Sequence, residues 1–134
     1  MIVLDTHIFV WWNQNDSKLT SYHRQVIERE REYGLGISTI SLIEIVRLVS
    51  VGRIILPLPI QEWFEIALSQ EGVILITITP EIAVEAQSLP GDFHKDPADR
   101  IIVATARVSD NPIVTVDRKI LDYSFVKVVA PNPN

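Results

Sequence analysis

Met1-Ile2-Val3-Leu4-Asp5 and Ile113-Val114-Thr115-Val116-Asp117 are the stretches that decide the fold of this 134-residue chain. Each is a short apolar run that ends in an aspartate, which is typical of a buried strand followed by a polar turn. If the two strands are parallel neighbours, both aspartates emerge at one edge of the sheet, where ligands bind in open α/β proteins. The pair therefore predicts a polar site at the strand ends.

Short strand-like runs alternate with longer helical patterns along the rest of the chain, which favours a parallel sheet covered by helices. We expect strands at 2–4, 35–38, 73–78, 113–116 and 123–129. We expect helices at 6–13, 19–32, 40–50, 59–69, 80–89, 97–108 and 118–122. Gly36 weakens the second strand, because glycine disfavours strand interiors. The predicted fold class is α/β, a twisted parallel sheet of about five strands flanked by α-helices.

Composition indicates one ordinary globular domain over residues 1–134, with a Pro-Asn tail that frays. Hydrophobic residues make up 47% and charged residues 22%, a balance that argues against disorder. The chain has no cysteine, which excludes disulfides, thiolate zinc sites and cysteine nucleophiles. No stretch reaches the ~18 apolar residues of a membrane span and no basic leader precedes Asp5, so we expect a soluble cytoplasmic protein with no membrane association.

The formal charge of −5 argues against a broad basic surface for nucleic acid. A polyanionic substrate would then depend on a bound metal and on local cations. The candidates are Lys95, Arg100, Arg118 and Lys119. Arg100 could also be a counter-charge to the acids just before it.

Four acids lie beside apolar segments and form the candidate site: Asp5, Glu44, Asp99 and Asp117. Clustered carboxylates repel and raise one another's pKa unless a cation neutralises them. A hard divalent cation such as Mg²⁺ prefers oxygen ligands. The four acids therefore predict a metal-dependent phosphodiester chemistry.

Helix capping, which aspartate does well, is an alternative explanation for Asp5 and Asp117 and also explains Asp96, which is close to Asp99. Asp5 and Asp117 could cap the helices that follow them, although capping does not explain why both follow strands. Asp96 could cap the next helix while Asp99 lies in its first turn. Spacing alone does not decide whether Asp96 or Asp99 would bind a metal.

Glu44 has two structural alternatives. It could close a capping box with Ser41. If Ser38 or Thr39 capped the helix instead, Glu44 would lie inside an apolar helix, where a buried acid is costly unless it is paired or metal-bound.

The remaining polar residues give weaker signals. His7, His23 and His94 lack zinc-type spacing, and we expect each to be structural or exposed. The chain has no Gly-rich phosphate loop and no nucleophile elbow. We expect the three tryptophans to pack in the core or at an interface.

Several segments, in their order and spacing, resemble PIN-domain nucleases, and most closely the VapC-type toxins of toxin–antitoxin pairs. They are Val3-Leu4-Asp5-Thr6-His7, Ile37-Ser38-Thr39-Ile40-Ser41-Leu42-Ile43-Glu44, His94-Lys95-Asp96-Pro97-Ala98-Asp99-Arg100-Ile101-Ile102-Val103-Ala104-Thr105-Ala106, and Val114-Thr115-Val116-Asp117. The resemblance covers nearly the whole chain, and its Asp-Pro-x-Asp-Arg segment is the most specific part.

The resemblance implies that the catalytic, metal-binding acids are Asp5, Glu44, Asp99 and Asp117. It prefers Asp99 to Asp96, which would cap the helix or support the ligands from behind. It further implies a PIN-like fold, one or two Mg²⁺ or Mn²⁺ ions, a homodimer, and inhibition by a cognate antitoxin protein.

The function we expect is endonucleolytic hydrolysis of RNA by metal-activated water, in the toxin component of a toxin–antitoxin pair. Arg100, Arg118 and Lys119 are the candidate substrate-binding residues. One alternative is a non-enzymatic partner-binding module whose acids only cap helices. A less favoured one is an aspartyl-phosphate phosphatase with Asp5 as nucleophile, weakened because His7 stands where such enzymes usually carry a second acid.

Overall fold

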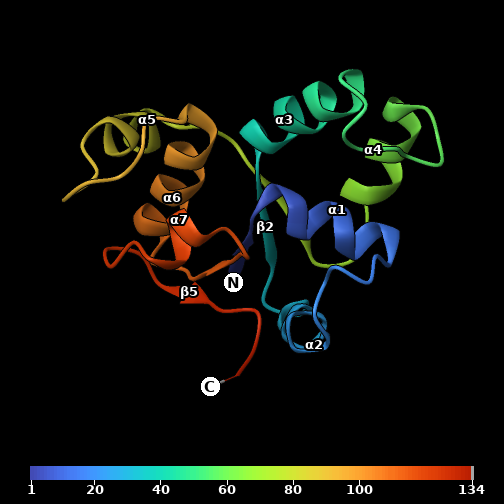
Figure 1. Ribbon diagram of the computed structural model, residues 1–134, viewed down its shortest axis with the longest axis horizontal. Coiled ribbons are helices and arrows are strands. Elements are labelled where there is room, and N and C mark those ends of the chain that lie inside the picture. The colour runs from blue at the N-terminus through green and yellow to red at the C-terminus, as the bar shows by residue number, and fades with distance from the viewer. Residues whose placement is uncertain (134) are drawn as a thin grey trace.

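The structure is a computed structural model that describes residues 1–133, and it shows a five-stranded sheet with helices on both faces (Figure 1). All strand pairs are parallel, in the order β3-β2-β1-β4-β5. The strands are β1 (Ile2–Leu4), β2 (Leu35–Ser38), β3 (Val73–Ile76), β4 (Ile113–Val114) and β5 (Val128–Val129). The helices are α1 (Thr6–Gln14), α2 (Ser21–Glu30), α3 (Thr39–Ser50), α4 (Ile60–Leu68), α5 (Pro80–Gln87), α6 (Pro97–Ser109) and α7 (Arg118–Leu121). The predicted α/β class and its parallel sheet are confirmed.

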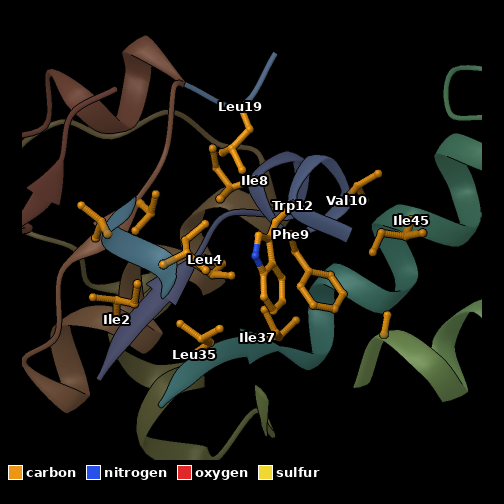
Figure 2. Close-up of a cluster of buried hydrophobic side chains, with 14 of the residues drawn as sticks. Ile2, Leu4, Ile8, Phe9, Val10, Trp12, Leu19, Leu35, Ile37 and Ile45 are labelled. Carbon is orange, nitrogen blue, oxygen red and sulfur yellow. The ribbon is translucent and has the colours of Figure 1, made fainter. Parts of the chain in front are cut away.

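The sheet divides the core into two apolar clusters, because successive side chains of a strand point to opposite faces. Ile2 and Leu4 of β1 pack into the cluster that includes α1 and α2, whereas Val3 packs into the cluster that includes α5 and α6. Figure 2 shows part of the first cluster, in which the Phe9 side chain of α1 lies against the sheet. The strand β1 is thus buried on both faces, and this packing fixes the position of Asp5, which follows it.

Two of the helices that carry the candidate site, α1 and α3, follow their strands without a linker. Helix α1 begins at Thr6, directly after Asp5, and α3 begins at Thr39, directly after β2. Because β1 lies between β2 and β4 and all three run parallel, the segments after these strands meet at one edge of the sheet. This arrangement confirms that β1 and β4 are neighbours.

Some boundaries differ from those predicted. Gly36 does not interrupt β2: a Cβ at this position would lie 2.6 Å from Ile76 Cδ1, so the Ile76 side chain of β3 occupies the space that a side chain at position 36 would need. The strand β4 ends at Val114, two residues early, since the Thr115 hydroxyl accepts a hydrogen bond from Asp117 N at 3.0 Å and turns the chain.

The last strand is also shorter than predicted. Only Val128 and Val129 pair with β4, because β4 offers only two residues to pair with. The Tyr123 ring packs instead against the Phe93 ring, with centroids 4.8 Å apart. The predicted fraying of the tail falls partly on Asn134, outside the described residues. Within residues 1–133 no helix is long and apolar enough to cross a membrane.

Candidate active site

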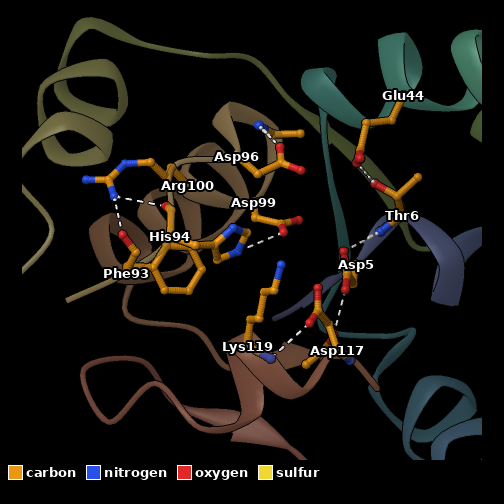
Figure 3. Close-up of polar contacts among 12 residues, drawn as sticks. Asp5, Thr6, Glu44, Phe93, His94, Asp96, Asp99, Arg100, Asp117 and Lys119 are labelled. Atoms are coloured by element: carbon orange, nitrogen blue, oxygen red, sulfur yellow. Dashed lines mark hydrogen bonds and ion pairs between the residues drawn. The ribbon is translucent and has the colours of Figure 1, made fainter.

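One open cleft of about 810 Å³ brings the four predicted acids together at the carboxyl edge of the sheet (Figure 3). Its lining includes Asp5, Glu44, Asp99 and Asp117, together with Asp96. The acids come from four separate segments: the end of β1, the interior of α3, the first turn of α6 and the turn after β4. The fold therefore brings these carboxylates together in one cleft, as the sequence predicted.

Asp5 is the most enclosed of the acids, with 8% of its surface exposed. Its Oδ1 accepts from Thr6 N at 2.9 Å, which caps α1, and its Oδ2 accepts from Thr115 Oγ1 at 2.6 Å. Burial raises the pKa of Asp5, the two hydrogen bonds oppose this shift, and repulsion from Asp117 adds to it. Asp5 is therefore both a helix cap and a fixed, partly desolvated carboxylate of the cleft.

Glu44 lies inside α3 and not in a capping box. Ser38 caps the helix, since its hydroxyl accepts from Ile40 N at 3.2 Å. Glu44 Oε1 accepts from Thr6 Oγ1 at 2.5 Å, and this hydroxyl is also 2.8 Å from Ser41 Oγ. Burial raises the pKa of Glu44, against the hydrogen bond from Thr6. Ser38 therefore caps α3, and Glu44 lies inside the helix, as the second alternative predicted.

Asp96 and Asp99 have different roles at the start of α6. Asp96 Oδ1 accepts from Ala98 N at 3.0 Å and caps the helix. Asp99 Oδ2 lies 3.0 Å from His94 Nε2. Burial first, and then repulsion by other carboxylates, raises the pKa of Asp99 to about 7. The repelling groups are Asp5, Asp96, Asp117 and Glu44.

Asp117 also combines two roles. Its Oδ1 accepts from Lys119 N at 2.9 Å and caps the single turn of α7, while the residue lines the cleft. Asp5, Asp96 and Asp117 are therefore all caps, and capping holds each of their carboxylates at the beginning of a helix. The capping and site interpretations of these residues are compatible.

The predicted cations are less well placed than the acids. The Arg100 guanidinium donates to the carbonyls of Ala86, Phe93 and His94 at 2.8, 3.0 and 3.2 Å. It lines a separate hollow between α5 and α6 together with Lys95. The expectation that Arg100 is a counter-charge to the neighbouring acids is therefore wrong, because backbone carbonyls already hold its guanidinium.

The other two predicted cations lie close to α7. Arg118 is exposed and lies 3.6 Å from Asp122, where it forms a surface ion pair. Lys119 is exposed and lines a hollow beside the His94 side chain; its side chain extends toward the acids in Figure 3. Of the cations named from sequence, Lys119 has the position best suited to a substrate.

Sequence reasoning missed the side chains that support the acids. His94, expected to be structural or exposed, contacts Asp99, and Arg100 fixes the His94 carbonyl. Thr6 and Thr115 supply hydroxyl groups to Glu44 and Asp5. One signal in the sequence could have pointed to Thr115: it is the polar residue within the apolar run 113–116, two residues before Asp117.

The donor set fits a hard divalent cation. All the candidate ligands are carboxylates, which suit Mg²⁺ and Mn²⁺. Within residues 1–133 none of the four forms an ion pair with Lys or Arg, so their mutual repulsion has no cationic compensation from the chain. No three acidic or histidine side chains of the described part are already closed into a ligand set, so some of them would have to turn toward an ion.

Comparison with known proteins assigns the chain to a known family. The PIN domain family matches residues 2–126, and the chain belongs to this family. Over 128 residues it is 36% identical to "Ribonuclease VapC22" of Mycobacterium tuberculosis, covering 96% of this chain and 95% of that protein. The resemblance to PIN-domain, VapC-type proteins is confirmed.

Solved structures agree with the fold. A chain from the structure of VapBC2 of Rickettsia felis bound to a promoter DNA fragment superposes with a TM-score of 0.71, at 19% identity and with 97% of this chain and 98% of that one covered. A chain from the FitAcB structure of Neisseria gonorrhoeae gives a TM-score of 0.68, at 17% identity and with 98% of each chain covered. These similarities extend over the whole domain and establish its fold.

Proposed function

We propose that this chain is a metal-dependent endoribonuclease and the toxin of a toxin–antitoxin pair, formed by one domain over residues 1–134. The observation that carries the proposal is the convergence of Asp5, Glu44, Asp99 and Asp117 on one cleft with no Lys or Arg pairing to them in the described residues. The name of the 36% identical relative, a ribonuclease, supports RNA as the substrate. The proposed substrate favours a cytoplasmic location.

Asp5, Asp99 and Asp117 would hold one or two Mg²⁺ or Mn²⁺ ions. A divalent ion in such a site lowers the pKa of bound water and stabilises charge that develops on the phosphate. Glu44 would complete the cluster by binding metal or by accepting a hydrogen bond from the attacking water. The Thr6 and Thr115 hydroxyls keep Glu44 and Asp5 oriented for this work, and His94 Nε2 lies 3.0 Å from Asp99 Oδ2.

Assembly with other chains follows from the same relatives. The Rickettsia felis neighbour is VapBC2 bound to a DNA fragment from its promoter, and another neighbour, from Klebsiella pneumoniae, belongs to a toxin–antitoxin complex. We infer a cognate antitoxin as the protein partner of this chain. The homodimer is proposed from the resemblance to VapC-type toxins and not from these structures.

The test measures cleavage of unstructured RNA by the purified protein. We expect cleavage in Mg²⁺ or Mn²⁺, none in EDTA, and restoration when metal is added back. The products should carry a 5′-phosphate and a 3′-hydroxyl, because water and not a protein group is the nucleophile. Asp5→Asn and Asp117→Asn should fold normally and lose both cleavage and growth inhibition.

Other results would contradict the proposal. Full activity of either variant in Mn²⁺ would remove that acid from the role assigned. Cleavage that persists in chelator would indicate a metal-free nuclease. Hydrolysis of a colourless phosphate ester without RNA cleavage would favour the phosphatase, and neither activity nor a Mn²⁺-induced shift in melting temperature would favour the partner-binding module.

A further inference from the structure

The acid cleft continues beyond the carboxylates along α1 and α3, and this second half has a different chemical character. Its lining includes Trp11, Arg47 and Arg53. Arg47 lies three residues after Glu44 on α3, so the two share one face of the helix, separated by about 4.5 Å along its axis. Arg53 follows the helix, and its backbone N–H donates to Leu48 O at 2.9 Å. Helix α3 and the turn after it thus place an acid and then two cations along the cleft.

These two arginines differ from the other six of the chain. Every other arginine side chain has a partner: Arg24 and Arg100 donate to carbonyls, and Arg29, Arg31, Arg107 and Arg118 pair with acids. In residues 1–133 neither Arg47 nor Arg53 forms a side-chain hydrogen bond or ion pair, and both are exposed. Both unpaired guanidinium groups therefore line the acid cleft, where they are free to bind a phosphate in a bidentate manner.

Trp11 differs from the other two tryptophans in the same way. Trp12 and Trp63 are buried, with 7% and 4% exposed, and donate their indole N–H to Glu28 and Gln14. Trp11 is half-buried and lines the cleft, with its ring 5.9 Å from the His7 ring. An accessible aromatic ring beside free cations is the combination that binds single-stranded nucleic acid.

We propose that Arg47 and Arg53 bind the phosphates that flank the scissile one, and that Trp11 stacks on an unpaired base. This assignment rests on the proposed function, because it takes RNA as the occupant of the acid half. The base must lie in a single strand, since the faces of a base inside a duplex are covered by the base pairs stacked on it. Arg47 and Arg53 set the path of the strand, and Trp11 selects single-stranded over duplex RNA.

The experiment measures binding separately from cleavage. Fluorescence anisotropy follows a short labelled single-stranded RNA and its duplex, in Mg²⁺, with the Asp99→Asn protein as background so that the RNA survives. We expect Arg47→Ala and Arg53→Ala each to weaken binding and to reduce the slope of log K against log salt by about 0.7, the contribution of one phosphate contact in single strands. Arg29→Ala, an exposed arginine on α2, is the matched control and should leave the slope unchanged.

The tryptophan test uses two variants that keep the apolar packing. Trp11→Leu should weaken single-stranded binding about 10-fold, within the range for one lost stacking contact, and leave duplex binding unchanged. Trp11→Phe should restore most of the affinity, which a purely structural role would not explain.

The outcomes separate this inference from the proposed function. Wild-type protein that cleaves RNA while Arg47→Ala and Arg53→Ala behave like Arg29→Ala overturns the inference and leaves the nuclease intact. Equal loss of single-stranded and duplex binding in Trp11→Leu also overturns it. Wild-type protein that cuts no RNA, while the salt slopes and the preference for single strands follow expectation, supports the binding residues and overturns the proposed reaction.

Discussion

The two ends of the cleft hold their charges in opposite ways. At the acid end, Asp5 is buried and hydrogen-bonded on both oxygens, and Glu44 is held by a threonine hydroxyl. At the other end, Arg47 and Arg53 are exposed, and within the described residues their guanidinium groups contact no polar partner. Asp5 and Glu44 are thus held by hydrogen bonds, whereas the Arg47 and Arg53 guanidinium groups are not.

The difference reflects what each end has to do. A cation and a reacting phosphate must be positioned to within a fraction of an ångström for catalysis, so the groups that hold them gain from rigid support. Contacts to flanking phosphates carry no such requirement and can adapt to different substrates. The rigid end is also the costly one, because burial and repulsion raise the pKa values of Asp5, Glu44 and Asp99.

The largest effect should come from neutralising one fixed acid. We expect Asp99→Asn to reduce RNA cleavage about 1,000-fold or more, because it removes a metal ligand from the site that activates water. Asp110→Asn is the control, since Asp110 is an exposed residue at the other end of α6 and has a left-handed conformation that asparagine accepts. If the two variants cleaved RNA equally well, Asp99 would have no role in catalysis.

The hydroxyl groups behind the acids should matter next. Thr115→Val removes two hydrogen bonds with little change of shape: the one that Thr115 Oγ1 donates to Asp5 and the one that it accepts from Asp117 N. We expect a 10- to 100-fold loss of metal affinity or activity, the usual range for a group that orients ligands. Thr105→Val makes the same change at another buried threonine, whose hydroxyl donates to Ile101 O at 2.7 Å within α6. Calorimetric titration with Mn²⁺ checks this, and equal affinities of the two variants would argue against support of Asp5 by Thr115.

The acid end should make the metal-free protein less stable as the pH rises. The pKa of Asp99 is about 7 in the folded chain and near 3.8 when unfolded, so the unfolded state releases its proton first. The cost is absent below pH 3.8, grows up to about pH 7 and is constant above it. Between pH 5.5 and pH 8 we expect a loss on the order of 2 kcal/mol in urea unfolding with EDTA. The decrease should be smaller in Asp99→Asn, and an unchanged profile in that variant would assign the pH dependence to other groups.

The smallest effect on stability should come from the exposed arginines at the other end of the cleft. Arg47→Gln should change the free energy of unfolding by less than about 0.5 kcal/mol, because the side chain is exposed and unpaired. Under the same metal-free conditions at pH 8, Asp99→Asn should raise it by about 2 kcal/mol, since it removes a repelled charge. Thermal unfolding of both variants measures this difference in stability. A clearly destabilised Arg47→Gln protein would show that the Arg47 guanidinium makes a stabilising contact in the folded chain.

Much of this molecule was readable from local patterns. The strand-then-aspartate pattern located Asp5 and Asp117, and Asp96-Pro97 located the start of α6. These predictions succeed because capping and strand burial depend on residues that are near one another in the sequence. The predicted strand at 123–129 was largely wrong, because its length depends on how many residues β4 offers as partners.

The sequence by itself determined which segments become buried strands and helices, and hence that an acid follows each of two strands. Only the tertiary structure decided that His94 contacts Asp99, that Arg100 is held by backbone carbonyls, and that Arg47 and Arg53 remain without partners beside the acids. The physical reason is the separation along the sequence of the residues that interact. Capping and side-chain alternation act between residues that are near one another in the sequence, whereas strand pairing and the partner of a long polar side chain depend on which distant segments the packed core brings together.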